Sequence, residues 1–573
     1  MMDKDLNLMI AGAAGQGMQT TGVVLGKFFV RSGCEVFALQ DNMSRIRGGH
    51  NFFQIRVSHN PVKAASTPLH VLIALNKESV QYHENEIIPG GAIIFDSDEN
   101  HFEGENGKFL GLPLSRLALE SGGDKLFSNS VAMGAVMAVL GWDIGILKDF
   151  LIEFFSARPD LARGNAVAAE AGYENALKNM CAYKGPKLSS RDTAKKMFIS
   201  GHEAVALGAL AAGCRFMSAY PMSPSTSIMT FLAGHAENFG IVVEQAEDEI
   251  AAVNMAIGAS YAGIRSLTAT SGGGFSLMAE AFGLAGITET PLVIIEAQRP
   301  GPATGLATRT EQADLLFVLH ASQDEFPRAI FAPGSAGEAF YQTIQAFDLA
   351  EKYQIPVVIL TDQYLADSYF TEPRFEIGDI KINRYLITEE EAEAISKYQR
   401  YKLTDSGISP RTVPGAYEFL VAADSHEHDE DGHMTEDPIL REKMMEKRFK
   451  KMEGLARELN HPEPVGDPDA DQILLGWGST QGPLAEAIEI LNHDGVSVKG
   501  LSLSELWPFP KQFMAEILTG VRKWGVVENN YTGQLARLIR MELLKEPDLM
   551  ITKYNGRPFT PDEIVREFKS AVR

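Results

Sequence analysis

The chain has 573 residues, 45% of them hydrophobic and 22% charged, the ordinary composition of a folded protein of about three or four domains. Its formal net charge of −23 argues against a nucleic acid or an anionic membrane as partner. The three cysteines, Cys34, Cys181 and Cys214, form no C-x-x-C pair, which excludes an iron–sulfur or zinc site built from this chain alone. No apolar run reaches the length of a membrane span and the N-terminus has no signal-peptide pattern, so we expect a cytoplasmic protein.

Residues 1–184 alternate predicted strands with predicted helices, which is the pattern of an α/β domain. Strands are expected at 6–10, 51–57, 71–75 and 92–95, and helices at 20–31 and 166–183. A polar segment rich in Gly, Pro and Ser follows at residues 185–196 and is typical of a linker.

The first strand runs directly into the glycine turn Gly12-Ala13-Ala14-Gly15-Gln16-Gly17 and then into a helix. Such a turn can present free backbone N–H groups to a phosphate at the helix N-terminus. Its spacing is not the dinucleotide fingerprint, and no ribose-binding acid is placed as that fingerprint asks, although Gln40 and Asp41 lie near the right distance. The alternative is a tight turn that packs a helix on a sheet. Downstream, the segment Ser44-Arg45-Ile46-Arg47-Gly48-Gly49-His50 places two arginines beside a glycine pair.

Residues 197–375 again alternate strands and helices, so a parallel sheet is expected. A helix should open at 201, strands are expected at 241–243, 266–270, 292–295 and 357–360, and a helix should run from the glycine loop to 287. Three segments fall at the carboxyl ends of strands, where open α/β sheets bind ligands. They are the turn Tyr220-Pro221-Met222-Ser223-Pro224-Ser225-Thr226, the loop Ser271-Gly272-Gly273-Gly274 and the run Gln298-Arg299-Pro300-Gly301.

Four acids, Glu244, Glu247, Asp248 and Glu249, precede or open a helix of small apolar residues. A carboxylate that opens such a helix would be desolvated, which suits a group that shares a proton. The alternative is a solvated helix N-terminus, where the helix dipole favours acids. The spacing alone does not separate Glu249 from Glu247 or Asp248.

The remaining chain divides into a looser stretch at 376–468 and a last α/β region at 469–573. The looser stretch holds a cluster of acids and histidines, DSHEHDEDGHMTED, which we interpret as hydrated surface acids, with a metal site as the alternative. Its helix REKMMEKRFKKMEGLARELN is amphipathic and charge-laced, which favours an arm over the surface or over a partner. The last region has expected strands at 472–475, 496–503 and 525–527.

The ordered motifs YPMSPST, EDEIAAVNMAIGAS, SGGGFSLMAE and EAQRPGPATG resemble the pyrimidine-binding domain of thiamine-diphosphate-dependent 2-oxoacid:ferredoxin oxidoreductases. The resemblance covers nearly the whole chain and is greatest to the alpha subunit of the 2-oxoglutarate type with its gamma domain fused in front. It implies a multi-domain α/β fold of parallel or mixed sheets flanked by helices. The implied domains are a gamma domain (1–184), a linker (185–196), a pyrimidine-binding domain (197–375), a connecting segment (376–468) and a transketolase C-terminal-like domain (469–573).

The resemblance also assigns roles to residues. It implies that Glu249, which has Gly258 nine positions after it as in the family motif, shares a proton with the cofactor's pyrimidine nitrogen. Ser223 and Arg299 would hold the C1 carboxylate of the substrate, and Ser223 keeps the hydroxyl of the family's usual Thr. The other implied contacts are Tyr220, Pro221 and Met222 for thiamine diphosphate, and Gly15, Gln16, Gly17 and Arg47 for coenzyme A.

The chain has no G-D-G run followed by an Asn pair, the usual grip on Mg²⁺ and diphosphate, and no cluster-binding cysteines. We therefore expect no metal in this chain. The resemblance implies that a beta subunit holds the diphosphate, Mg²⁺ and a 4Fe-4S cluster, in a heterotetramer of two alpha and two beta chains that reduces ferredoxin. The implied reaction is the CoA-dependent oxidative decarboxylation of 2-oxoglutarate to succinyl-CoA and CO₂. The alternatives are pyruvate or branched-chain substrates, a non-catalytic scaffold subunit, and a dinucleotide-binding oxidoreductase.

Overall fold

The computed structural model of the chain describes residues 5–43, 48–102, 108–179 and 183–572. The chain divides into two compact units. Unit 1 comprises Met1–Ile199, Ser368–Arg374 and Thr560–Asp562, and unit 2 comprises Ser200–Asp367, Phe375–Phe559 and Glu563–Arg573. Within the described residues, no helix combines the length and the apolar character that crossing a membrane requires.

Unit 1 is built on an eight-stranded mixed sheet. Its strands, in spatial order, are β6 (Phe109–Leu112), β5 (Ile87–Asp96), β4 (Leu69–Ala74), β1 (Leu6–Ala14), β3 (Gly48–Ser58), β2 (Glu35–Asn42), β14 (Tyr369–Glu372) and β7 (Met197–Ser200). The strands β1, β4, β5 and β6 are parallel, whereas β3 is antiparallel to both β1 and β2. The strand β14 lies near the end of the second expected domain, residues 197–375, and pairs with β2.

The two helices that follow β1 and β4 lie on opposite faces of this sheet. Leu8 of β1 shares one core with Phe28 of α1, whereas Met9 and Ala11 share another with Val80 of α2. Because side chains alternate along a strand, α1 and α2 cover opposite faces of the sheet. The carboxyl ends of β1 and β4 therefore form a switch point, where open α/β sheets bind ligands. The helices of unit 1 are α1 (Met18–Arg31), α2 (Lys77–His83), α3 (Leu114–Leu117), α4 (Ser128–Leu140), α5 (Ile144–Phe154) and α6 (Pro159–Lys178).

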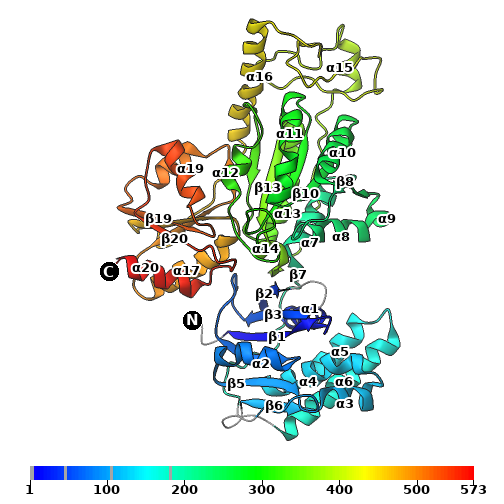
Figure 1. The fold of residues 1–573 in the computed structure, drawn as a ribbon, viewed down its shortest axis with the longest axis vertical. Coiled ribbons are helices and arrows are strands. Elements are labelled where there is room, and N and C mark those ends of the chain that lie inside the picture. Colours follow the sequence, from blue (N-terminus) through cyan, green and yellow to red (C-terminus); the bar gives the residue numbers. More distant parts are fainter. Residues whose placement is uncertain (1–4, 44–47, 103–107, 180–182, 573) are drawn as a thin grey trace. The chain divides into compact units, whose positions relative to one another are not determined.

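Unit 2 contains a seven-stranded sheet and a five-stranded sheet (Figure 1). The larger has the order β18 (Glu505–Trp507), β12 (Ala329–Phe331), β13 (Pro356–Asp362), β11 (Leu292–Gln298), β10 (Ser266–Thr270), β8 (Phe216–Ala219) and β9 (Val242–Gln245). From β12 to β9 its strands are parallel, and β18, which comes from the last region of the chain, joins antiparallel to β12. The smaller has the order β15 (Val465–Gly466), β17 (Lys499–Leu503), β16 (Gln472–Trp477), β19 (Lys523–Glu528) and β20 (Leu549–Thr552).

One buried apolar cluster joins the helices of the larger sheet to the smaller sheet, so unit 2 has a continuous core. Phe282 of α11, Leu315 of α12 and Trp477 of β16 belong to it. The helices of the larger sheet and its extensions are α7 (Gly201–Ala211), α8 (Thr226–Gly234), α9 (Ala236–Phe239), α10 (Glu249–Tyr261), α11 (Gly272–Ile287), α12 (Leu315–Leu319), α13 (Ala336–Tyr353), α14 (Gln363–Asp367), α15 (Glu389–Ala394) and α16 (Pro438–Ala456). Those of the smaller sheet are α17 (Gln481–His493), α18 (Lys511–Ile517), α19 (Gln534–Leu543) and α20 (Pro561–Val572).

The charge-laced helix predicted in the connecting stretch is α16, and its cationic side is buried rather than solvated. Asp437 caps it by accepting the backbone N–H groups of Ile439 and Leu440. Further along, the ammonium groups of Lys447 and Lys451 both contact the carboxylate of Glu289, just beyond the end of α11. The helix is therefore attached to the larger sheet of unit 2 by a buried ion cluster.

Most of the predicted strands and helices are present in the structure, but three predictions differ clearly from it. The helix expected at 166–183 is α6, which spans Pro159–Lys178, and β1 continues through Gly12–Ala14, which were expected to belong to the glycine turn. Residues 271–274 were expected to form a loop, and this is wrong because α11 begins at Gly272. The glycines serve close packing: a Cβ on Gly272 would lie 2.4 Å from Oδ2 of Asp314, and one on Gly274 would lie 2.1 Å from Oγ1 of Thr270. A smaller difference is β17, which begins at Lys499 rather than at 496.

Candidate active site

The three acids at the start of α10 have three different environments. Asp248 is the N-cap residue, with an extended backbone, and its Oδ1 accepts the N–H of Ala251 at 2.7 Å. Glu247 is exposed to solvent, whereas Glu249, the first helical residue, is only 3% exposed. The geometry therefore singles out Glu249 as the desolvated carboxyl, a distinction that spacing alone did not make.

The carboxyl of Glu249 lies against the start of α11. A Cβ on Gly274 would stand 2.7 Å from Oε1 of Glu249, so any side chain there would displace the carboxyl. This Oε1 is buried and has no hydrogen-bond partner among the described residues. A buried acceptor left without a donor is costly, so the atom is suited to a partner that the chain itself does not supply.

The predicted substrate and cofactor residues meet at the same edge of the sheet. The strands β8, β10 and β11 are parallel neighbours, so the segments that follow them come together. Nη1 of Arg299 donates to the backbone carbonyl of Ser223 at 2.7 Å, and burial lowers the pKa of Arg299 from its ordinary value. The Thr270 hydroxyl lies 4.0 Å from the sulfur of Met222.

The turn that begins at Tyr220 is partly open to solvent. Tyr220 is 40% exposed, and Pro221, Met222 and Ser223 are half-buried. The structure thus brings the turn, Glu249 and Arg299 to one partly open site in unit 2. The roles of these residues toward a cofactor and a substrate remain predictions.

Four carboxyl groups behind this site were missed by sequence reasoning. Glu296 on β11 is fully buried, and burial together with Asp314 raises its pKa well above the ordinary range. Burial also raises the pKa of Asp314 and of Asp362 to about 6, and that of Glu311 to about 7. The signal in the sequence was a Glu inside the otherwise apolar strand LVIIEAQ.

Comparison with known proteins decides the family. Three family models match: Pyruvate ferredoxin/flavodoxin oxidoreductase over residues 7–175, Pyruvate flavodoxin/ferredoxin oxidoreductase, thiamine diP-bdg, over 207–447, and Pyruvate:ferredoxin oxidoreductase core domain II over 470–564. The 2-oxoacid:ferredoxin oxidoreductase subunit alpha of Saccharolobus solfataricus is 31% identical, with 99% of this chain and 98% of that protein covered. The chain belongs to the 2-oxoacid:ferredoxin oxidoreductase family.

Two further relatives agree with this family. The 2-oxoglutarate oxidoreductase subunit KorA of Mycobacterium tuberculosis is 30% identical, with 99% of this chain and 91% of that protein covered. The solved 2-oxoglutarate:ferredoxin oxidoreductase from Magnetococcus marinus, which has 2-oxoglutarate, coenzyme A and succinyl-CoA bound, is 33% identical and superposes with a TM-score of 0.92 over 100% of both chains. The chain is thus the alpha subunit of a family oxidoreductase that acts with partner subunits, and all the residues predicted to contact the pyrimidine lie inside the matched thiamine-diphosphate-binding region.

Three of the four residues predicted to bind coenzyme A, Gly15, Gln16 and Gly17, lie in unit 1 at the switch point between β1 and β4. Gly15 and Gly17 have φ of 95° and 77°, a backbone conformation that favours glycine. The side chain of Gln16 braces the turn, because its Oε1 accepts the N–H of Ala13 at 2.7 Å and its Nε2 donates to the carbonyl of Leu75 at 3.1 Å. Arg47, also predicted to bind coenzyme A, lies outside the described residues.

The N-terminus of α1 has no capping side chain among the described residues, and the amide of Asn129 lies against it, donating to the carbonyl of Gln16 at 3.0 Å. Gly17 is its N-cap residue, and no side chain caps the helix and no acid lies in its first turn. Near this turn, Nε2 of His50 lies 2.7 Å from Nε2 of His83, and Nδ1 of His83 lies 2.7 Å from Glu86. Sequence reasoning missed this histidine pair, since the two residues are 33 positions apart.

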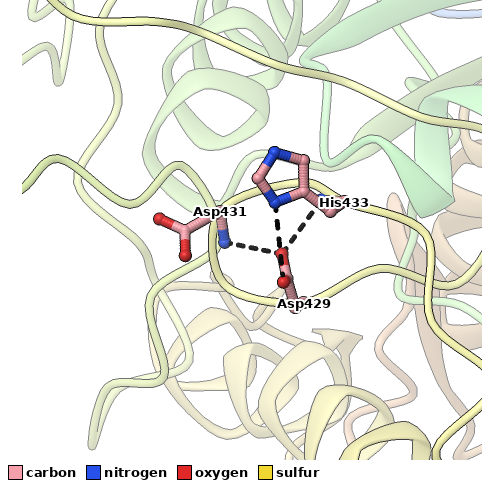
Figure 2. Close-up of side chains that lie close together, drawn as sticks. All are labelled: Asp429, Asp431 and His433. Carbon is pink, nitrogen blue, oxygen red and sulfur yellow. Dashed lines mark hydrogen bonds and ion pairs between the residues drawn. The ribbon is translucent and has the colours of Figure 1, made fainter.

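The acid- and histidine-rich stretch brings Asp429, Asp431 and His433 close together (Figure 2). Asp429 points into its own loop, where Oδ1 accepts the backbone N–H groups of Asp431 and His433 at 3.0 and 2.9 Å. Asp431 is ion-paired with Lys397 at 2.7 Å. These carboxylates therefore already serve to fold the loop, and the expectation that this chain holds no metal stays a prediction.

Proposed function

We propose that this chain is the alpha subunit of a 2-oxoglutarate:ferredoxin oxidoreductase, which converts 2-oxoglutarate and coenzyme A to succinyl-CoA and CO₂ and passes the electrons to ferredoxin. The observation that carries the proposal is the buried, unpartnered Oε1 of Glu249 at the pyrimidine site. It is supported by the Magnetococcus marinus enzyme, which superposes over the whole chain and whose structure contains 2-oxoglutarate, coenzyme A and succinyl-CoA.

The residues at the edge of the larger sheet fit thiamine diphosphate. When bound, this cofactor supplies the nucleophilic carbon and the electron sink that decarboxylation of a 2-oxoacid needs. Tyr220, Pro221 and Met222 would line the pyrimidine ring, and Gly274 leaves the room that Glu249 occupies. A pyrimidine nitrogen would give the covered Oε1 of Glu249 the partner it lacks.

Each polar side chain of this chain then has a defined task. Glu249 holds a proton at the pyrimidine nitrogen, which is the act of a general acid–base. Arg299 binds the substrate's C1 carboxylate with its planar guanidinium, with the hydroxyl of Ser223 beside it. The 2.7 Å bond from Arg299 to the Ser223 carbonyl holds these two groups next to each other before the substrate arrives.

The other components would come from elsewhere in the assembly. A beta subunit would hold the diphosphate, Mg²⁺ and the 4Fe-4S cluster, in a heterotetramer of two alpha and two beta chains. Within this chain, Gly15, Gln16, Gly17 and Arg47 would contact coenzyme A. The uncapped N-terminus of α1 suits one of its phosphate groups.

The test is to purify the chain with the product of its neighbouring beta-subunit gene and to assay a panel of 2-oxoacids with coenzyme A and a viologen acceptor. We expect reduction of the viologen with 2-oxoglutarate and formation of succinyl-CoA. Turnover of pyruvate alone would refute the substrate, and turnover of none would refute the function.

Glu249→Gln tests the role of the carboxyl, with Asp248→Asn and Glu247→Gln as matched controls on the same helix start. The amide is nearly isosteric, so the complex should assemble, while activity falls by at least about 100-fold because proton sharing is lost. Proton exchange at C2 of the bound cofactor, followed by NMR, should slow in the same variant and in neither control. Normal exchange in Glu249→Gln, with slow exchange in a control, would mean that another carboxylate holds the proton.

A further inference from the structure

The loop that carries Arg299 is closed at its base by two carboxyl groups. The loop leaves β11 after Gln298 and returns to α12, which begins at Leu315. At its return, the backbone N–H of Asp314 donates to Oε1 of Gln298 at 3.0 Å, and the side chain of Asp314 lies beside that of Glu296. Glu296 and Gln298 are two residues apart on β11, so both point to the same face of the sheet. One face of this strand therefore grips the end of the loop.

The chemistry of the contact requires a shared proton. Both oxygens of Glu296 are buried, and none of the described residues offers either of them an N–H or O–H donor. The group beside these oxygens is the carboxyl of Asp314. Two ionised carboxylates can only accept hydrogen bonds, so Glu296 and Asp314 can bond to each other only when one of them holds a proton. Two adjacent carboxylates in a dry site do not both ionise, so the pair keeps one proton.

The surroundings decide which partner holds that proton. Asp314 lies against the N-terminus of α11, where a Cβ on Gly272 would stand 2.4 Å from its Oδ2. The positive end of a helix favours a carboxylate, so Asp314 is the ionised partner and Glu296 the protonated one. The other charged groups that bear on the pair are acids, since Asp362 acts on Glu296 and Glu311 lies beside Asp314. No cation stands near enough among the described residues to replace the proton.

Along its returning half, the loop is attached to the smaller sheet of unit 2 and its loops. Gln312 donates its backbone N–H to the carbonyl of Asn529 at 2.7 Å and its Nε2 to the carbonyl of Trp477 at 2.7 Å. Residues 301–306 are exposed, so the outgoing half is steadied by β11 and by the bond from Arg299 to Ser223. The contact of Glu296 with Asp314, together with the bond from Asp314 N–H to Gln298, thus links the anchored half of the loop to the strand from which Arg299 emerges.

We propose that Glu296 and Asp314 form a proton-sharing clasp that positions Arg299 for binding of the 2-oxoacid carboxylate, and that the clasp fails when Glu296 ionises. Both are positioning residues, because they act through the loop and not on the substrate. The effect on substrate binding rests on the proposed function, whereas the clasp itself does not. The clasp predicts that the KM for the 2-oxoacid is steady at neutral pH and rises at alkaline pH, and that kcat changes less.

Three variants of the complex with the beta subunit test this. Glu296→Gln donates an amide N–H to Asp314 at every pH, so its KM for 2-oxoglutarate should stay flat where the wild-type KM rises by about tenfold, the change produced by roughly 1.4 kcal/mol of lost binding. Asp314→Ala removes the clasp and should show the raised KM at every pH. Glu311→Gln removes a neighbouring loop acid outside the clasp, so the alkaline rise in KM should persist, at a pH no higher than in the wild type.

A second measurement needs no turnover. In infrared spectra of the full chain at pH 8, above the pKa of about 7 of Glu311, the carbonyl-stretch band of protonated carboxylic acids should lose intensity in Glu296→Gln and keep it in Glu311→Gln. Hydrogen exchange at one fixed pH should be faster for residues 299–313 in Asp314→Ala than in the wild type. An alkaline rise in KM that persists in Glu296→Gln, or that vanishes in Glu311→Gln, would overturn the clasp. Absence of turnover with a normal infrared result would instead refute only the proposed function.

Discussion

The buried ion cluster under α16 gives the strongest stability prediction in unit 2. Glu289, Lys447 and Lys451 each have at most 2% of their side chain exposed, and both ammonium groups contact the one carboxylate. Arg400 adds a bond of 2.7 Å from Nη2 to the backbone carbonyl of Glu289. Replacing Glu289 by Gln would leave two buried ammonium groups without a counter-charge, so each must either stay charged in a dry site or give up its proton. Breaking a buried pair from one side costs about 3–5 kcal/mol, and that is the loss of unfolding free energy we expect at pH 7.

The pH dependence of that loss follows from the same three groups. Burial alone would raise the pKa of Glu289, but the ammonium groups of Lys447 and Lys451 outweigh it and lower the pKa below the ordinary value. Its stabilising contribution is therefore present above the unfolded pKa of about 4.3 and is lost as the pH falls below it. Burial lowers the pKa of Lys451 to about 7, even with Glu289 present. In Glu289→Gln both lysines should deprotonate readily, so the deficit should shrink as the pH rises from 7 to 9.

Tryptophan fluorescence can follow this transition in unit 2 by itself. Three of the four tryptophans, Trp477, Trp507 and Trp524, lie in unit 2, so a Trp142→Phe background removes the signal of unit 1. Urea titrations then give the difference in unfolding free energy between the background and its Glu289→Gln variant.

A matched control replaces all three charged members by apolar residues, in Glu289→Leu with Lys447→Met and Lys451→Met. Removing a whole buried ion cluster is often neutral or stabilising, by up to about 4 kcal/mol, so this variant should be at least as stable as the background. A loss below about 1 kcal/mol in Glu289→Gln at pH 7, or a larger loss in the triple variant, would refute the ionic account of this contact.

Three further outcomes are expected. Arg299→Ala should lower kcat/KM for 2-oxoacids by roughly 30- to 1000-fold, the equivalent of about 2–4 kcal/mol. Arg299→Lys should restore little of this activity because an ammonium lacks the planar, two-pronged shape of the guanidinium. Unchanged kinetics in Arg299→Ala would show that Arg299 does not bind the substrate. Burial raises the pKa of Asp362 to about 6, so its neutral form stabilises the fold below the unfolded pKa and this contribution is lost as the pH rises through 6. Asp362→Asn should therefore gain on the order of 2 kcal/mol relative to the wild type between pH 4.5 and pH 8 in urea unfolding, and an equal difference at both values would contradict this. Burial raises the pKa of Cys34 to about 11 and that of Cys214 to about 12. Alkylation of these thiols at pH 8, followed by peptide mass spectrometry, should therefore be more than about 100-fold slower in the native than in the denatured chain. Rapid labelling of either cysteine in the native chain would show that its thiol is accessible.

Periodicity and turn residues predicted most strands and helices because those signals are local. The strand 266–270 and the helix end at 287 agree with the structure, and α7 begins at Gly201 as expected. The error at Ser271–Gly274 has a non-local cause. A run of glycines is typical of a loop, but here it begins a helix. The residues are glycines because Asp314, distant in sequence, and Thr270 occupy the space that their side chains would need.

Non-local partners also explain two features that the sequence did not predict, one in each unit. The strand β14 joins the sheet of unit 1 through pairing with β2, more than 300 positions earlier, and no local pattern encodes such a partner. The charge-laced pattern of α16 is typical of a solvated helix, and it did not show that Lys447 and Lys451 would be buried against Glu289. Burial of these cations depends on a single carboxylate that follows α11, 158 and 162 residues before them.

The acids at the start of α10 show how a site can be recognisable by motif and still be unassigned at the level of single residues. Glu247, Asp248 and Glu249 are chemically alike, and a helix N-terminus favours all three. Their roles separate only when the backbone turns from the extended conformation of Asp248 into the helix, because each step then points the side chain in another direction. Asp248 accepts the backbone N–H of Ala251, Glu247 faces solvent, and the carboxyl of Glu249 packs against Gly274. Selectivity among the three acids therefore comes from the cap and from one glycine on a neighbouring helix, so enlarging Gly274 to Ala should disable Glu249 as effectively as replacing the acid itself.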